Sequence, residues 1–440
     1  MLVKIFIMVS IVLLVLPVLL ELALRWYVES PLRTDFYSSI NEEDVLDRQA
    51  YWGIKVASGP NWAHLGWIAD PEWETYRIEW MDGSGRWTEV GRAEYGSFLI
   101  GPGGTGKYRV IALVKDGTKH AVGEAVVQVV QKDVPVLLPK LVGDWQVLFK
   151  PARAGTYVND HTIFRDGSGN WRLVGITSAS DGDYNQEKWF AQGVSEEFPP
   201  AEPMREVERV ADFGELAWAP SVLETNGKWH MFWSPHALHQ MESDDGVTWR
   251  NHTVTLPAPY RKFFRDGMVY QVAADQWLLY TTARGRYHSS IDVYQSFDLK
   301  EWQFIRSAVS GGWRSERNSP FASMESPFLI AWQDRYYLSF TYNNDSGAIH
   351  GLFMPMKIWW PNRQTYNDTL VLTSKNPYDF GEYNGKANTP NLVGQITAHA
   401  PEWVDVPGKG WYITTAGWPW VTELTNGEVA VAPIDWVIVR

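Results

Sequence analysis

Residues 157–178 read YVNDHTIFRDGSGNWRLVGITS and have the form of a β-hairpin. Two apolar-rich runs flank an Asp-Gly-Ser-Gly turn, and the second run opens on Trp171. Runs of this kind, separated by a glycine-containing turn, are typical of antiparallel strands. An Asn-Asp-His triplet begins the first strand, where a plain hairpin requires no charge. Asp160 therefore needs an explanation beyond strand formation.

The same pattern recurs four more times in the C-terminal part of the chain. Each copy has a polar or unusual start, a strand, a turn, and an aromatic residue that opens a second strand. The copies are WAPSVLETNGKWHMFWS (218–234), RDGMVYQVAADQWLLYTTA (265–283), MESPFLIAWQDRYYLSFTY (324–342) and AHAPEWVDVPGKGWYITTAG (398–417). Spacings of 48 to 75 residues between the aromatic anchors suit four-stranded units with loops of variable length. The repeats predict a five-bladed β-propeller over residues 140–440.

Three of the five repeats carry an acid at the same distance from the aromatic anchor. The residues eleven positions before the anchors are, in chain order, Asp160, Trp218, Asp266, Glu325 and Ala400. The first strand of each blade lines the axis of a propeller, so equivalent positions converge in space. An isolated acid at a turn more often accepts hydrogen bonds from backbone N–H groups. Three acids at matched positions instead predict a carboxylate cluster at the mouth of the axis.

These motifs resemble those of the five-bladed propeller glycoside hydrolases, family 43 above all and, more distantly, families 32 and 68. The resemblance is carried by Asn159-Asp160, Trp218-Ala219-Pro220, Arg265-Asp266, Glu325-Ser326-Pro327 and AHAPEW (398–403). The first motif ends in His161 where proline is usual, and the third reads Arg-Asp-Gly where Asp-Pro is common. Both departures bear on subfamily and substrate more than on the class of reaction.

The resemblance implies a role for each acid. Asp160 would be the general base of an inverting enzyme, Glu325 the general acid, and Asp266 the charge that keeps Glu325 protonated. Cleavage through an oxocarbenium-like transition state needs these two functions on opposite sides of the sugar. In the fructoside families the first aspartate would be a nucleophile, so a retaining mechanism stays open. Glu316 and Glu402 are alternative candidates for the acid.

The sequence also contains candidates for contact with a sugar. We expect Asn159, Trp218, Arg265, Trp313 and Trp418 to bind substrate. The chain has 25 Trp and 20 Tyr, and aromatic rings stack on sugars, although large β-domains also use them as core residues. Trp218 is open to either reading.

The resemblance implies no required cofactor, but it allows a structural Ca²⁺ at the propeller axis. His399, in the fifth repeat, is the candidate ligand, or else a structural histidine. Calcium prefers oxygen ligands, so a histidine would be an unusual member of its shell. The chain has no cysteine, which excludes disulfides and thiolate metal sites.

The N-terminal third divides into three parts. Residues 5–20 form an uncharged apolar run after Lys4, so residues 1–25 are predicted to be a signal-anchor helix, with a cleaved signal peptide as the alternative. Residues 26–45 have the composition of a tether. Residues 46–133 alternate at period two around glycine turns, which predicts a small β-sandwich of immunoglobulin or fibronectin type.

The net charge excludes one class of partner, and the family resemblance indicates one class of enzyme. The net charge of −12 without a basic run argues against nucleic acid as a partner. The repeats predict an all-β chain, the apolar N-terminal run an extracytoplasmic and membrane-anchored one, and the resemblance implies a glycoside hydrolase that acts on an oligo- or polysaccharide. An arabinofuranosidase or xylosidase of inverting mechanism is the leading hypothesis. A retaining fructosidase or transglycosidase, and a glycan-binding propeller without turnover, are the alternatives.

Overall fold

The computed structural model is all-β in the residues that it describes. These are residues 53–69, 73–114, 117–152, 156–178, 186–210, 213–257, 264–284, 289–311, 323–343, 368–383, 389–417 and 425–438. None of these segments forms an α-helix, and so none supplies a helix that could cross a bilayer. The predicted anchor (1–25) and tether (26–45) lie outside the described residues.

Two antiparallel sheets form the N-terminal part. The three-stranded sheet has the order β1 (Lys55–Gly59), β2 (Trp62–Gly66), β5 (Ser97–Ile100), and the four-stranded sheet has the order β4 (Trp87–Ala93), β3 (Trp73–Met81), β6 (Gly106–Val114), β7 (Lys119–Val127). Both sheets contribute to one core, in which Trp67, Tyr76 and Ile78 are fully buried. Alternate side chains of β6 face this core, as expected for strands with one solvated face.

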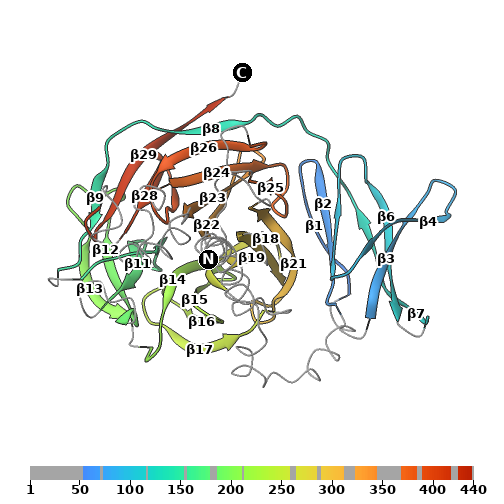
Figure 1. Ribbon diagram of the computed structural model, residues 1–440, viewed down its shortest axis with the longest axis horizontal. Coiled ribbons are helices and arrows are strands. Elements are labelled where there is room, and N and C mark those ends of the chain that lie inside the picture. The colour runs from blue at the N-terminus through green and yellow to red at the C-terminus, as the bar shows by residue number, and fades with distance from the viewer. Residues whose placement is uncertain are drawn as a thin grey trace, which may run out of the picture.

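Five further sheets surround a common centre (Figure 1). We number them I to V in chain order. Sheet I is β10 (His161–Arg165), β11 (Trp171–Thr177), β12 (Trp189–Ser195) and β13 (Arg205–Val210). Sheet II is β14 (Trp218–Thr225), β15 (Lys228–Ser234), β16 (Leu238–Ser243) and β17 (Arg250–Thr255). Sheet III is β18 (Arg265–Ala273), β19 (Gln276–Arg284), β20 (Ser289–Ser296) and β21 (Gln303–Ser310), with β25 (Gly381–Glu382) added in parallel.

Sheets IV and V complete the ring. Sheet IV is β22 (Ser323–Trp332), β23 (Arg335–Asn343), β24 (Asp368–Ser374) and β26 (Leu392–Thr397). Sheet V is β27 (Trp403–Val406), β28 (Gly410–Thr415), β29 (Val429–Ile438) and β8 (Leu137–Leu141), and β9 (Gln146–Phe149) also pairs with β29. The all-β propeller predicted from the repeats is confirmed, and each predicted hairpin supplies the first two strands of one sheet.

Sheet V joins the two ends of the ring. Its outermost strand, β8, precedes sheet I in sequence but pairs antiparallel with β29, from Ile434↔Leu141 to Ile438↔Leu137. The last described strand is thereby hydrogen-bonded to a strand from before the first sheet. Sheet V is thus built from strands on both sides of the ring in sequence, and the hydrogen bonds between β8 and β29 close the ring.

The ring has a separate apolar core at each junction of neighbouring sheets. One buried cluster lies between sheets I and II, one between II and III, one between III and IV, one between IV and V, and one between V and I. The third strand of sheet III, β20, is buried at all eight of its residues because both of its faces are covered. Its polar Asp292 accepts hydrogen bonds at Oδ1 from the hydroxyls of Ser290 and Ser307, at 2.9 and 2.7 Å.

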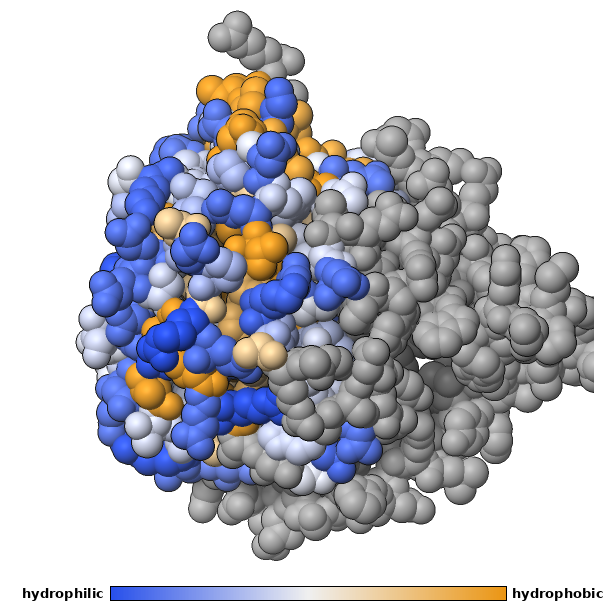
Figure 2. All heavy atoms as spheres, turned by 90° about the vertical axis from the view of Figure 1, so that its left-hand side faces the viewer, coloured by the Kyte–Doolittle hydropathy of each residue, from blue (hydrophilic) through white to orange (hydrophobic). Residues whose placement is uncertain are grey.

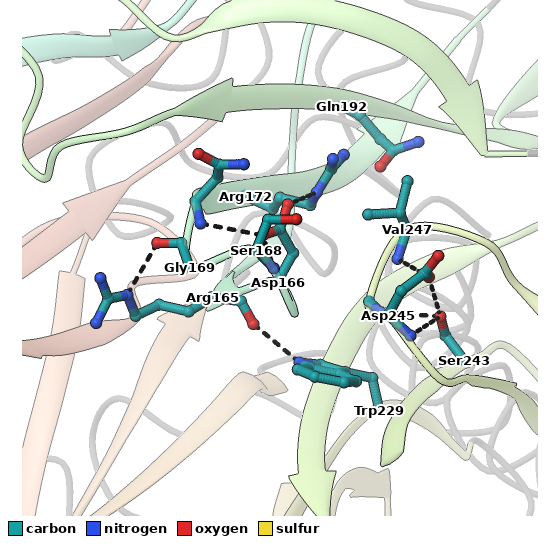
Figure 3. A network of polar contacts seen from close by, with 12 residues as sticks. Arg165, Asp166, Ser168, Gly169, Arg172, Gln192, Trp229, Ser243, Asp245 and Val247 are labelled. Atoms are coloured by element: carbon teal, nitrogen blue, oxygen red, sulfur yellow. Dashed lines mark hydrogen bonds and ion pairs between the residues drawn. The ribbon is translucent and has the colours of Figure 1, made fainter. Parts of the chain in front are cut away.

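Polar turns add to the contact between sheets I and II (Figure 3). In the turn of sheet I, Asp166 accepts hydrogen bonds from the backbone of Ser168 at 3.0 Å and from Arg172 Nε at 2.7 Å. The turn between β16 and β17 is held by Asp245 in the same way. Gly167 N donates to Asp245 O at 2.8 Å, which joins the two turns. Ser296 and Asp298 build the equivalent turn of sheet III.

Exposed apolar side chains gather where the ring closes. Figure 2 shows a largely hydrophilic face with an apolar patch at the top, the direction in which β8 and the end of β29 lie in Figure 1, and further apolar patches in the middle and at the lower left. Exposed apolar residues on or beside these strands are Val142, Val147, Val437 and Ile438. This apolar surface belongs to the closing sheet and not to the centre of the ring.

The N-terminal sheets pack beside sheets III and IV (Figure 1). Trp62, which is 1% exposed, lies edge-on to Tyr336 and Tyr378, with ring centroids 6.1 and 5.6 Å away. Gln295 Nε2 donates to Gly96 O at 2.6 Å, so polar contacts also cross this interface. The contact is an extension of the core between sheets III and IV.

We predict that Trp62→Ala destabilises the whole chain. The substitution removes an indole from a packed core, and such truncations cost about 3–5 kcal/mol. Urea unfolding monitored by tryptophan fluorescence and by circular dichroism measures the loss. Trp87→Ala is the matched control, because Trp87 is only partly buried on β4 and its ring lies under Arg109. Equal effects of the two substitutions would contradict the prediction.

Candidate active site

The strand register defines which residues are equivalent at the mouth of the ring. In the first strand of each sheet, one residue pairs with the fifth residue after the aromatic anchor on the second strand. This residue is Trp218 in sheet II, Arg265 in sheet III and Glu325 in sheet IV. Backbone hydrogen bonds give Asp160 and His399 the same place in sheets I and V, through Ile176 and Ala416.

The predicted equivalence is therefore correct in sheets I, II and IV, and wrong by one residue in sheets III and V. In sheet III the cause is an additional register shift between Gln271 and Ala273. In sheet V the first hairpin closes with Val406 opposite Gly410, whereas the hairpin of sheet II closes with Thr225 opposite Lys228. Asp266 and Ala400 consequently lie one residue beyond the matched position.

A bulge follows the matched position in four of the sheets. Ala219, Asp266, Ser326 and Ala400 all have positive φ angles, of 49°, 55°, 51° and 45°. Bulges re-aim side chains and occur next to active sites, and a non-glycine residue in this conformation is held there by its surroundings at a cost of about 1–3 kcal/mol. The bulge places Asp266 and Ser326 at the same level of neighbouring sheets.

One arginine and one serine connect the three acids. Arg265 Nη1 lies 2.8 Å from Asp266 Oδ2, and Arg265 Nη2 lies 2.5 Å from Glu325 Oε1. The hydroxyl of Ser326 donates to Asp160 Oδ1, while its backbone N–H donates to Asp266 Oδ2 at 3.2 Å. The acids from sheets I, III and IV thus form one cluster, as the repeats predict.

The cluster is almost closed to solvent. Asp160, Asp266 and Glu325 are 9%, 3% and 5% exposed. Burial raises the pKa of Asp160, and the nearby charge of Glu325 raises it further, against the hydrogen bond from Ser326 and the charge of Arg265. Burial also raises the pKa of Asp266 to about 6, with Asp160 and Glu325 acting in the same direction and Arg265 opposing them. Perturbed acids in a shared site are a mark of catalytic centres.

A small cavity of about 30 Å³ opens beside the cluster. Its lining residues are Asp160, His161, Ala219, Pro220, Ser221, Asp266, Gly267, Met268, Ser326, Pro327, Phe328, Ala400, Pro401 and Glu402. The volume suits about one water molecule, which needs two to four polar partners. Asp160, Asp266 and Ser326 supply such partners.

Glu402 is a third acid in the wall of this cavity. It is 6% exposed, and burial raises its pKa to about 8 despite hydrogen bonds from Ile163 and Thr162. The backbone N–H of Ile163 donates to Glu402 Oε2 at 2.6 Å. Glu402 lies two residues beyond the bulge of sheet V. The sequence would predict this position only if the fifth repeat were aligned on Pro401 and not on its aromatic anchor.

The remaining predicted residues fall into two groups. His399 Nε2 lies 2.8 Å from Asn159 Oδ1, and both side chains are buried but absent from the cavity wall. Trp218 packs against the core between sheets I and II, while the three residues that follow it line the cavity. Trp313 and Trp418 lie outside the described residues.

No metal cluster accompanies His399. Among the residues that the structure describes, no group of three or more His, Asp and Glu side chains is arranged to hold an ion. His161, next to the predicted base, contacts Thr414 Oγ1 through Nε2 at 2.7 Å, and burial lowers its pKa to about 3. It is therefore a neutral histidine held by Thr414.

Comparison with known proteins gives one family match. Residues 213–387, which span sheets II, III and most of IV, match the N-terminal domain of glycosyl hydrolases family 32. No curated protein matches the chain. The match confirms two predictions from the sequence, namely that the chain resembles the propeller glycoside hydrolases and that it is a glycosidase.

Solved structures of similar fold include enzymes of two families. A thermostable family-43 glycoside hydrolase is 14% identical and matches over 66% of this chain and 96% of its own, with a TM-score of 0.47. An exo-1,5-α-L-arabinanase from a bovine ruminal metagenomic library is 14% identical over 66% of this chain and 100% of its own, with a TM-score of 0.43. The family 32 β-fructofuranosidase of Bombyx mori is 12% identical over 66% and 62%, with a TM-score of 0.43.

We predict that Glu402→Gln makes the protein less sensitive to alkaline pH. A pKa raised from 4.5 to about 8 means that the folded state keeps a proton that the unfolded state loses. The stabilising contribution is complete below the ordinary pKa and is lost as pH rises towards 8. Because each pKa unit is worth about 1.4 kcal/mol, the free energy of unfolding of the variant should gain up to several kcal/mol relative to wild type between about pH 5 and pH 9.

Urea titrations at both pH values measure this difference. Glu224→Gln on β14 is the control, because Glu224 is an exposed acid on the first strand of sheet II. Parallel pH dependence of wild type and Glu402→Gln would show that the buried carboxyl does not hold its proton.

Proposed function

We propose that this protein hydrolyses a furanosyl or pentosyl linkage in an oligo- or polysaccharide, with an arabinofuranosidase-type activity as the leading candidate. The observation that carries the proposal is the cluster itself. Carboxylates from three different sheets are linked through Arg265 and Ser326, and two of them, Asp160 and Asp266, line one cavity. A structural role does not require three buried acids linked in this way, whereas glycoside cleavage requires at least two acids.

In the proposed mechanism, Asp160 is the general base. Its carboxylate takes a proton from a water molecule, and the resulting oxygen attacks the anomeric carbon while the glycosidic bond breaks. Glu325 gives its proton to the leaving oxygen. The hydrogen bond from Ser326 orients Asp160 and favours its ionised form.

The ion pair with Arg265 determines when Glu325 can act as the general acid. Its ion pair with Glu325 must open when substrate enters, because the leaving group needs a proton on that carboxyl. Asp266 offers Arg265 a second partner at 2.8 Å, so the guanidinium need not lose all of its pairing. Asp266 thus acts on Glu325 partly through Arg265, and not only by direct repulsion.

A retaining mechanism is the second candidate. The family 32 match across sheets II to IV and the Arg265-Asp266 pair favour it. In that case Asp160 is the nucleophile and forms a glycosyl-enzyme, and Glu325 serves first as acid and then as base. A fructofuranoside would then be the natural substrate class.

The wider setting belongs to the same proposal. We infer a five-bladed propeller as catalytic domain (140–440), a β-sandwich (46–133) as its companion, and an extracytoplasmic location with residues 1–25 as membrane anchor. The five sheets and the two N-terminal sheets support the first two inferences. A structural Ca²⁺ near His399 stays a prediction.

We predict that Asp160→Asn lowers the rate of glycoside hydrolysis by about 10²–10⁴-fold, the contribution of a positioned acid or base. Aryl arabinofuranosides, xylosides and fructofuranosides are the substrates to assay. Asp405→Asn is the matched control, because Asp405 is an exposed aspartate on the first strand of sheet V. Undiminished turnover by a folded Asp160→Asn protein would sink the mechanism.

Proton NMR of the first-formed sugar decides between the two mechanisms. An inverting enzyme gives the anomer opposite to the substrate, and a retaining enzyme gives the same anomer. We expect inversion. Retention, together with trapping of a covalent adduct on Asp160, would establish the second candidate.

A further inference from the structure

Glu402 belongs to a ring of side chains one level beyond the bulges. Ser221, Met268, Phe328 and Glu402 each follow the bulge of their own sheet, and each lies opposite the third position after the aromatic anchor. All four line the cavity beside Asp160. Glu402 is the one member of this ring that titrates.

Two hydrogen bonds hold the Glu402 carboxyl in place, and both partners donate. Ile163 N donates to Oε2 at 2.6 Å, and the hydroxyl of Thr162 donates as well. Thr162 Oγ1 also accepts from Val222 N at 3.4 Å, which leaves its own O–H available to donate to the carboxyl. The Ile163 N–H cannot accept a proton, and while Thr162 donates to the carboxyl it does not accept the O–H of Glu402.

The surroundings favour a neutral Glu402. The wall of the cavity also includes the apolar Met268 and Phe328, and burial is the cause of the Glu402 pKa of about 8. The charged and titratable groups of the surrounding strands are Asp160, His161, Arg265, Asp266, Glu325 and His399. Three of these are acids and both histidines are buried, so a further negative charge would be unfavourable at neutral pH.

A neutral carboxyl must place its O–H on an acceptor. A buried donor without a partner costs about 1–3 kcal/mol, and the partners of Glu402 are both donors. The cavity is the space into which the O–H can point. A sugar hydroxyl bound over Asp160 would offer an oxygen lone pair there.

We propose that Glu402 is a specificity-determining residue that donates a hydrogen bond to one hydroxyl of the sugar held against Asp160. The inference rests on the proposed function and deepens it, because it assigns substrate recognition to sheet V. Recognition of a hydroxyl by a buried donor discriminates strongly against a substrate that lacks it, since the donor is then left unpaired.

Monodeoxy substrates test this role. For a para-nitrophenyl arabinofuranoside and its analogues, each lacking one ring or side-chain hydroxyl, we expect one analogue to lose about 10-fold or more in kcat/KM with wild type. In Glu402→Ala that discrimination should fall to about onefold, whereas Glu402→Gln, which keeps a donor and an acceptor, should preserve it. Glu224→Gln should behave as wild type.

The pH dependence separates recognition from a structural role. Wild type should lose its discrimination above about pH 8, where the carboxyl ionises, and Glu402→Gln should keep it there. A structural role would change stability alone and leave the ratio between substrates untouched. If discrimination against every analogue is the same in wild type and Glu402→Ala, the inference is wrong.

Binding distinguishes this inference from the function on which it rests. If wild type hydrolyses no furanoside or pentoside, the proposed function fails, and calorimetry with L-arabinose, D-fructose and their monodeoxy forms decides the inference. A binding difference between a sugar and its deoxy form that vanishes in Glu402→Ala supports it. Binding that does not depend on Glu402, or no binding of these sugars, overturns it.

Discussion

The ion pairs of Arg265 with Asp266 and Glu325 are the contacts on which the central site depends. Removing one partner of a buried ion pair leaves an uncompensated charge and costs about 3–5 kcal/mol. The two acids that Arg265 contacts and Asp160 beside them are each less than a tenth exposed. Such a cluster exists only where the surrounding frame fixes its members against their mutual repulsion. The five cores between neighbouring sheets, and the pairing of β8 with β29 that closes the ring, supply this frame.

Most of the fold could be predicted from one hairpin and its four copies. The features that predict it are local: the aromatic anchors, the glycine turns and the apolar runs. A strand pattern of period two can be recognised in the sequence without knowledge of tertiary contacts. The convergence of Asp160 and Glu325 followed because propeller geometry converts equal sequence positions into neighbouring points in space. Trp218 shows the limit of this reasoning. Its position in the repeat predicts its height along the propeller axis, but not that its side chain packs into the core between two sheets.

Residue counting fails where the backbone adds or omits one residue. The register shift in β18 moves Asp266 to the bulge and puts Arg265 at the matched place, and no feature of the sequence marks such a shift. The error matters chemically, because it exchanges a carboxylate for the cation that joins the two other acids. His399 and Asn159 illustrate the same point, since their contact is set by the register of sheets I and V and not by their spacing in sequence. Glu402 was visible as a spare acid, but its burial became apparent only with the ring of side chains around it.

Burial disfavours the ionised form of each acid in the site, and this determines which of the acids keep their protons. Burial raises the pKa values of Asp160, Asp266 and Glu402 above their ordinary range, and neighbouring carboxylates raise those of Asp160 and Asp266 further while Arg265 lowers them. A base must be ionised and a donor must be protonated at the same pH, and groups whose environments differ in this way can divide the two tasks. The contact of Ser326 with Asp160 favours the ionised form there, whereas burial favours the neutral form of Glu402. In the proposed mechanism, sheets I and V present opposite charge states to the same cavity, and the range of pH in which both persist is the range in which that mechanism operates.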